Sequence, residues 1–218
     1  MHIEFLVEDL SGEKALKLLL PKILGTQDTY KIRHYKGIGH LPHNLKPKTG
    51  ASKRILLDQL PKLLQGFGKT FAGYGYDYPA AVVVICDLDD KDKDSFLQEL
   101  KEMLAKCTPQ PETRFCLAIE EFEAWYLGDK EALLRAYPKL KQAVLAKYEQ
   151  DAICGTWETL ADAVYDGGHA ALSKKGYQAV GMEKSNWAER ISPYMDVSRN
   201  LSPSFNSFLT TLSKLLSA

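Results

Sequence analysis

The chain has 218 residues, of which 45% are hydrophobic and 26% charged, which is typical of a globular protein that buries a core in one domain, with or without an extension. Lysine plus arginine and aspartate plus glutamate both number 28, so the zero net charge gives no overall attraction to nucleic acid or membranes. Four scattered cysteines argue against a zinc site or a disulfide framework, and no signal peptide or membrane span is visible, so we expect a soluble, cytosolic protein with no membrane partner.

The first part of the chain alternates short apolar runs with amphipathic segments, the pattern of crossover units in a parallel sheet. We predict strands at residues 3–7, 30–35, 80–86 and 114–119, helices at 11–24, 52–64, 92–105 and 120–127, and long loops at 37–50 and 66–79. The strand at 80–86 is the clearest, because an unbroken β-branched run is typical of a central parallel strand. Ser11 is the predicted N-cap of the first helix.

After Gly128 no further strand is convincing, and the pattern favours helices only. They are predicted at residues 130–137, 140–148, 157–165, 185–194 and 205–216. The predicted fold class is therefore α/β, a Rossmann-like parallel sheet flanked by helices with a C-terminal helical region. We place the α/β domain at residues 1–128 and a helical extension packed on it at 129–218.

Acidic residues follow two of the best strands. Glu8 comes directly after the first strand, with Glu13 in the following helix, and Asp87 and Asp89 come after the strand at 80–86. Sites in open α/β sheets form outside the carboxyl ends of the strands, and carboxylates gathered there repel each other unless a cation neutralises them. Hard oxygen ligands suit Mg²⁺ or Mn²⁺, so Glu8, Glu13, Asp87 and Asp89 are candidate metal ligands.

A further acidic element, Glu-Glu-Phe-Glu at residues 120–123, follows the fourth predicted strand. If a helix begins at Glu120, then Glu120 and Glu123 share a face and Glu121 points elsewhere. We therefore add Glu120 and Glu123 to the candidate metal ligands. The structural alternative is that all these acids are N-caps, turn formers or first-turn helix residues.

Several of these motifs together resemble an uncharacterised bacterial family of Toprim-like domains. They are Glu8 with Ser11-x-Glu13, Asp87-x-Asp89, Ala-Ile-Glu-Glu-x-Glu-Ala-Trp at 118–125, Gly-Thr-Trp-Glu at 155–158 and Asn-Leu-Ser-Pro-Ser-Phe at 200–205. The resemblance covers nearly the whole chain. It implies the Toprim fold, which primases, topoisomerases and OLD-type (overcoming lysogenization defect) nucleases share.

In that superfamily one glutamate and an Asp-x-Asp pair bind Mg²⁺ and act in phosphodiester chemistry, which the resemblance assigns to Glu8, Asp87 and Asp89. OLD-type enzymes often have a second glutamate where this chain has Gly12, with Glu13 one place later, and Asp9 replaces the usual glycine. The resemblance also implies a separate ATPase partner, because OLD-type nucleases carry an ATPase domain and this sequence contains no phosphate-binding P-loop. A defence role against phage would fit such a pairing by analogy.

A phosphodiester enzyme needs basic groups for its nucleic-acid substrate. The candidates are Lys46, Lys48, Lys53 and Arg54, beside a loop with His40 and His43, and Lys184 is one of several ambiguous lysines in the helical half. Solvated loop charges are the alternative. The leading hypothesis is a Mg²⁺- or Mn²⁺-dependent nuclease or related phosphodiester enzyme of Toprim type. The rivals are a non-catalytic metal-binding or interaction subunit, which Gly12 favours, and a receiver-like phosphoacceptor domain, which also places acids after its first and third strands.

Overall fold

The computed structural model describes residues 1–75, 78–152 and 155–217, which form two compact units. The first unit contains Met1–Glu13, Leu24–Cys86 and Lys91–Leu117. The second contains Lys14–Ile23, Asp87–Asp90 and Ala118–Ala218. The predicted boundary at residue 128 stays a prediction. No helix of the described residues is both long and apolar enough to cross a membrane.

The first unit is built on a four-stranded parallel sheet with the strand order β2-β1-β3-β4. The strands are β1 (His2–Val7), β2 (Thr29–His34), β3 (Ala80–Asp87) and β4 (Thr113–Ala118). Central β3 is the unbroken apolar run of the sequence, and its residues 81–86 are all buried, as expected of an inner parallel strand. The predicted α/β fold class is confirmed.

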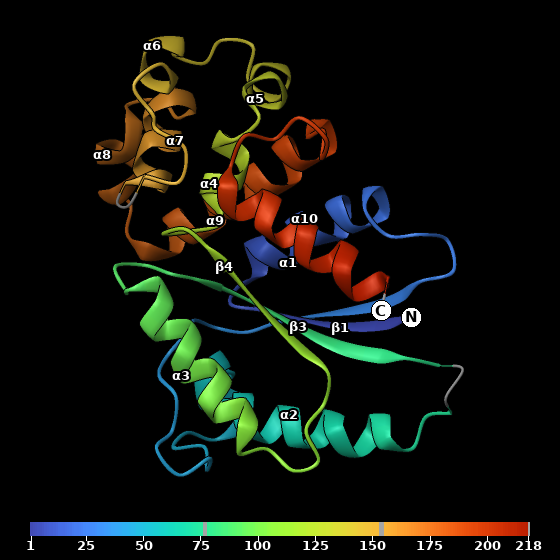
Figure 1. Cartoon of the computed structure of the whole chain (residues 1–218). Coiled ribbons are helices and arrows are strands. Elements are labelled where there is room, and N and C mark those ends of the chain that lie inside the picture. Colours follow the sequence, from blue (N-terminus) through green and yellow to red (C-terminus); the bar gives the residue numbers. More distant parts are fainter. Residues whose placement is uncertain (76–77, 153–154, 218) are drawn as a thin grey trace. The chain divides into compact units, whose positions relative to one another are not determined.

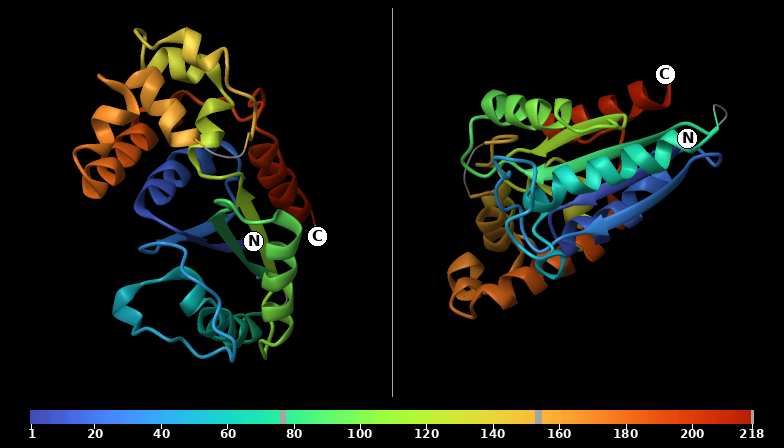
Figure 2. Two further views of the ribbon diagram at one scale, coloured as in Figure 1. Left: turned by 90° about the vertical axis from the view of Figure 1, so that its left-hand side faces the viewer. Right: turned by 90° about the horizontal axis from the view of Figure 1, so that it is seen from below.

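Two helices of the first unit, α2 (Leu56–Ala72) and α3 (Lys93–Ala105), cover the same face of this sheet (Figures 1 and 2). The predicted range of α2 was wrong: the helix begins four residues later than residue 52 and continues through Gly66 and Gly68 into the expected loop. Gly68 allows the helix to pack closely against Pro109, because a Cβ added to it would lie 2.0 Å from the backbone oxygen of Pro109. Helix α3 begins after Asp92, whose side chain accepts the backbone N–H of Ser95.

The remaining helices belong to the second unit, apart from α1 (Leu10–Leu19), whose residues are divided between the two units. They are α4 (Glu123–Leu127), α5 (Lys130–Ala136), α6 (Gln142–Leu145), α7 (Thr156–Val164), α8 (Gly168–Ser173), α9 (Tyr177–Ile191) and α10 (Pro203–Leu216), and short 3-10 helices lie at Leu20–Lys22, Ala51–Lys53 and Ser192–Tyr194. Helix α8 was not predicted. The prediction for α9 was wrong at its start by eight residues, because its first half exposes Tyr177 and Met182 and so lacks an amphipathic pattern.

An aromatic cluster forms the core of the second unit between α4 and α10, which lie side by side in Figure 1. The ring of Trp125 lies 4.2 Å from that of Phe122, 5.2 Å from Phe205 and 5.0 Å from Phe208. Its indole N–H donates to the Ser204 hydroxyl at 3.1 Å, so the buried ring has a polar partner. Trp125 is therefore core, as the sequence indicated.

The Asn-Leu-Ser-Pro-Ser-Phe motif at 200–205 closes this core. The buried Asn200 side chain donates to the Trp125 carbonyl at 2.8 Å and accepts the Ser202 N–H at 2.9 Å, and Ser202 caps α10 by accepting from Phe205. A Cβ on Gly128 would lie 2.1 Å from the Asn200 side-chain oxygen, so only glycine fits there. The motif is therefore explained by structure alone.

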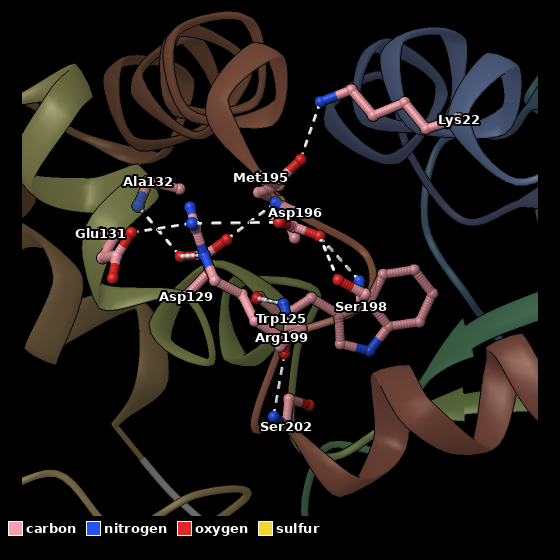
Figure 3. Close-up of polar contacts among 11 residues, drawn as sticks. Lys22, Trp125, Asp129, Glu131, Ala132, Met195, Asp196, Ser198, Arg199 and Ser202 are labelled. Atoms are coloured by element: carbon pink, nitrogen blue, oxygen red, sulfur yellow. Dashed lines mark hydrogen bonds and ion pairs between the residues drawn. The ribbon is translucent and has the colours of Figure 1, made fainter.

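Figure 3 shows a second polar anchor of this unit, centred on the buried Asp129. Its carboxylate accepts the backbone N–H of Ala132, which caps α5, the backbone N–H of Asp196, and a guanidinium N–H of Arg199. The ammonium of Lys22, in the 3-10 helix Leu20–Lys22, donates to the carbonyls of Ser192, Pro193 and Met195, which follow α9. These bonds tie that 3-10 helix and the start of α5 to the segment that follows α9, within the second unit.

Candidate functional site

The sheet reverses its order between β1 and β3. The chain moves from β1 outward to β2 on one side, and β3 then pairs with the other side of β1, with Val7 opposite Ile85. Crevices for ligands form outside the carboxyl ends of the strands at such a switch point. Glu8 is the residue after β1, and Asp87 is the last residue of β3. The two acids therefore follow the two strands that define the switch point.

Asp9, and not Ser11, caps α1, so the predicted N-cap was wrong. The Asp9 carboxylate accepts the backbone N–H of Gly12 at 2.8 Å and the hydroxyl of Ser11 at 2.6 Å. Glu13 in the first turn directs its carboxylate to Nδ1 of His34, at the end of β2. The structure thus gives Glu13 a histidine partner that the sequence did not suggest.

Asp89 adopts the left-handed conformation, with φ of 51°, which is uncommon outside glycine. Its N–H donates to the carbonyl of Glu120 at 3.0 Å, and the N–H of Leu88 donates to the carbonyl of Ala118 at 2.9 Å. The segment that follows β3 is therefore held against the segment that follows β4. This brings Asp87 and Asp89 to the acidic residues 120–123.

The prediction that Glu120 begins a helix was wrong. The helix begins at Glu123, and Glu120 is left-handed with φ of 57°, so the expected shared face of Glu120 and Glu123 does not exist. Both oxygens of the Glu120 carboxylate accept backbone N–H groups at 2.7 Å, from Gly155 and Thr156. Glu120 thus caps the N-terminus of α7, where a negative charge is favourable.

We predict that Glu120→Ala lowers the free energy of unfolding by about 2–4 kcal/mol, because two charge-assisted hydrogen bonds are lost. Urea unfolding measures this, with the exposed Glu149→Ala as the matched control. Mn²⁺ should raise the melting temperature of wild type and Glu120→Ala by the same amount, since the residue acts as a cap. A metal-induced rise that vanishes in Glu120→Ala would instead make Glu120 a ligand.

Glu121 and Glu123 face Lys184 of α9, and with Asp87 these residues form what we call the acid–lysine cluster. The Lys184 Nζ lies 2.7 Å from an oxygen of Glu121 and 3.4 Å from an oxygen of Glu123. Glu123 is only 1% exposed, and the lysine side chain 14%. The prediction that Glu121 points elsewhere was wrong, because the left-handed Glu120 turns the chain before α4 begins.

The charges of this cluster shift its acid–base behaviour. Burial alone would lower the pKa of Lys184, but the negative charges of Glu123, Glu121 and Asp87 outweigh it and raise that pKa above its ordinary value of 10.5. Burial, together with the charge of Glu123, raises the pKa of Glu121 to about 7, although Lys184 opposes the shift. Lys184 is therefore charged at neutral pH, and Glu121 titrates there.

A charged residue at a buried helical position was the signal in the sequence for Lys184. It shares one face of α9 with the buried Trp187, Ala188 and Ile191, at spacings of three, four and seven residues. The sequence analysis began this helix at residue 185 and so left Lys184 outside it. With the observed start at Tyr177, the position falls on the packed face.

Of the predicted phosphate-binding residues, Lys46, Lys48 and Lys53 are exposed and Arg54 is half-buried. The loop that carries the lysines is fixed by the buried Asp58, which accepts the backbone N–H groups of Lys48 and Thr49. Those hydrogen bonds outweigh burial and hold the pKa of Asp58 below its ordinary value. Arg54 instead turns inward and donates to the carbonyl of His34.

The fit of a divalent metal depends on which acids have other partners. Across residues 1–75, 78–152 and 155–217, no three His, Cys, Asp or Glu side chains form a group that could hold a metal ion. Glu120 caps α7, Glu123 contacts an ammonium, and Glu13 contacts His34. Glu8, Asp87 and Asp89 still supply hard oxygen ligands, and Mg²⁺ is usually held by only one or two carboxylates with water and substrate phosphates. Metal binding by Glu8, Asp87 and Asp89 therefore stays a prediction that depends on the chemistry of their carboxylate oxygens.

Comparison with known proteins gives one family. No curated protein and no solved structure matches the chain. The model of the family described as Domain of unknown function (DUF4276) matches residues 7–213, which includes both units and the acid–lysine cluster. The chain therefore belongs to this domain family of unknown function.

Proposed function

We propose that the chain is a divalent-metal-dependent nuclease of Toprim type. The observation that carries the proposal is that Glu8 and Asp87 follow the neighbouring strands β1 and β3 at the switch point of a parallel sheet. The left-handed Asp89 supports it further, because strained backbone at a residue other than glycine is concentrated at functional sites. Toprim affiliation is part of the proposal, and so is binding of nucleic acid.

In this proposal the carboxylates of Glu8, Asp87 and Asp89 would hold the cation, Mg²⁺ or Mn²⁺. When bound, the ion would supply Lewis-acid stabilisation of the phosphate charge. Glu121, with a pKa of about 7, is suited to move a proton during hydrolysis at neutral pH. Lys184 keeps the carboxylates of Glu121 and Glu123 in place.

The proposal includes a separately encoded ATPase as partner. The zero net charge leaves little electrostatic attraction to DNA, so we expect cleavage by the isolated chain to be weak. Because this sequence has no P-loop, nucleotide hydrolysis would have to come from another chain. A role in defence against phage is the biological setting that such a pair suggests by analogy.

We predict slow cutting of single-stranded or supercoiled DNA in Mn²⁺, lowered by about 100-fold or more in Glu8→Gln and in Asp87→Asn/Asp89→Asn, because these changes remove proposed metal ligands. Gel electrophoresis of products over time measures the rate. Asp90→Asn is the matched control, since Asp90 is an exposed acid next to Asp89.

Calorimetric titration of Mn²⁺ into the same proteins separates catalysis from binding. Wild type and Asp90→Asn should bind Mn²⁺, and the double mutant should bind it at least about 10-fold more weakly. Equal Mn²⁺ binding by all three proteins contradicts the metal assignment. Metal binding without cleavage in the presence of the ATPase would favour the non-catalytic alternative.

A further inference from the structure

A cavity of about 440 Å³ lies in the first unit, at the carboxyl end of β2. Its polar lining consists of Glu13, Arg33, His34, Tyr35, Arg54 and Gln59. We call it the arginine cavity. Two of these residues were selected from the sequence, Arg54 as a phosphate-binding candidate and Glu13 as a metal ligand.

Arg54 brings a positive charge into this cavity. Its guanidinium donates to the carbonyl of His34, and among the described residues it forms no ion pair with a carboxylate. A guanidinium has five N–H donors and is always charged at neutral pH. Most of those donors are therefore available to an anion that enters the cavity.

Tyr35 adds an unused donor. The residue is 8% exposed, and within the described part of the chain its hydroxyl has no hydrogen-bond partner. Because Tyr35 lines the cavity, its hydroxyl can donate a hydrogen bond to a ligand that enters. Burial raises the pKa of Tyr35, and the charges of Arg33 and Arg54 oppose this rise, which is consistent with both cations lying close to the phenol.

The other two basic groups are held in place. Nε and Nη2 of Arg33 donate to the two oxygens of Glu4, at 2.8 and 3.2 Å, which leaves Nη1 for another acceptor. The guanidinium also lies 5.7 Å from the centre of the Phe67 ring. Glu13 binds Nδ1 of His34 and so orients that imidazole. The cavity is thus pre-organised before any ligand binds.

We propose that the arginine cavity binds a phosphate group of the nucleic-acid substrate, through the guanidinium of Arg54 and the hydroxyl of Tyr35. That the ligand is a nucleic acid rests on the proposed function. That the cavity binds a phosphate group rests on the residues of the cavity alone. Arginine matches a phosphate in charge and in the planar geometry of its donors, and the tyrosine hydroxyl supplies a further hydrogen bond to an oxygen. The exposed Lys46, Lys48 and Lys53 are assigned no part in this site.

The test is equilibrium binding in EDTA, so that no divalent metal and no cleavage are involved. The probes are a fluorescent single-stranded DNA hexamer with a 5′-phosphate, the same hexamer with a 5′-hydroxyl, and inorganic phosphate as competitor. Arg54→Gln should weaken binding of the phosphorylated hexamer by about 10-fold or more, and Tyr35→Phe by about 3-fold, because each removes donors to the phosphate. The neighbouring Lys53→Gln is the matched control and should change binding by less than about 2-fold.

The pattern across probes identifies the phosphate. Selective loss of the phosphorylated hexamer in Arg54→Gln supports a terminal phosphate, and equal loss of both hexamers supports an internal phosphodiester. If Arg54→Gln weakens the binding of inorganic phosphate but of neither hexamer, the assignment to nucleic acid is contradicted. Equal effects of Arg54→Gln and Lys53→Gln, with Tyr35→Phe unchanged, overturn the cavity itself.

Repeating the titrations in Asp87→Asn/Asp89→Asn separates this inference from the proposed function. If wild type shows no cleavage but binds the hexamer in a way that depends on Arg54, the phosphate site is supported and the nuclease proposal is contradicted. If Arg54→Gln cleaves DNA as wild type does and binds the hexamer with unchanged affinity, the nuclease proposal is supported and the phosphate site is contradicted. Melting curves of all variants confirm that each is folded.

Discussion

Lys184→Met is expected to lower the free energy of unfolding by about 3–5 kcal/mol at pH 8, the cost of removing one partner from a buried ion pair. The lysine ammonium lies within 3.4 Å of Glu121 and Glu123, both within the second unit and both largely buried. Methionine has a similar length and fills the same space, so the loss isolates the charge from the packing. Urea unfolding of wild type and variant measures it.

Two further variants sharpen this result. Lys184→Met/Glu121→Gln/Glu123→Gln should recover most of the lost stability, because the carboxylates that the ammonium neutralised are then gone. Lys174→Met is the matched control, since Lys174 is an exposed lysine of the same unit, and it should change stability by less than about 0.5 kcal/mol. A loss below about 1 kcal/mol in Lys184→Met would mean that the cluster is solvated and unimportant for stability.

The direction of the pKa shift of Lys184 determines the pH range in which this lysine stabilises the fold. The folded pKa of Lys184 is raised above 10.5, so its contribution to stability is fully present below that value and is lost only as the pH rises beyond it. Titration of Lys184 itself is therefore not expected to change the stability between pH 5 and 9. Any pH dependence in that range must come from other groups.

The sequence predicted the sheet well because burial dictates the composition of an inner strand. Residues 81–86 are all buried, and an unbroken β-branched run of this kind is typical of a central parallel strand. The positions of the acids after β1 and β3 could also be predicted, because the apolar runs show where these strands end. The switch point between β1 and β3 required the strand order, which the sequence does not contain.

The sequence did not predict the acid–lysine cluster, for two physical reasons. A left-handed glutamate is rare, so nothing marked Glu120 as the residue that turns the chain and reverses the roles of Glu120 and Glu121. The second reason is that Lys184 meets its partners across more than 60 residues of sequence, on a helix whose exposed apolar residues hide its start. Contacts at that distance depend on tertiary packing, and propensity carries no information about them.

The arginine cavity shows the same limit. Arg54 could be named as a basic loop residue, but its difference from the exposed Lys53 depends on a left-handed turn with φ of 55°. That turn directs the guanidinium to the carbonyl of His34, at the end of a strand 20 residues earlier. Four basic residues were equal candidates in the sequence, and only packing distinguishes the inward arginine from the solvated lysines.

Glu121 should make the protein less stable as the pH rises from about 4.5 to about 7. Its ordinary pKa of 4.5 is raised to about 7, by burial first and then by the charge of Glu123. A group whose folded pKa is raised contributes stability that is fully present below its unfolded pKa and lost as the pH passes its folded pKa. A shift of this size corresponds to about 3 kcal/mol, and the side chain is only 19% exposed, so little of it is screened.

Glu121→Gln tests this directly, because glutamine keeps the size of the side chain and can still accept from Lys184, but it does not titrate. Urea unfolding at pH 5, 6, 7 and 8 should show wild type losing about 2.5 kcal/mol relative to Glu121→Gln across that range, with the variant the more stable protein at pH 8. Carboxyls with lowered pKa values, such as Asp58, change protonation below pH 4 and so do not contribute to this difference. The exposed Glu149→Gln should give a curve parallel to that of wild type. If Glu121→Gln is also parallel, the Glu121 carboxyl titrates at its ordinary pKa, and it cannot serve as the proton-transfer group of the proposed hydrolysis.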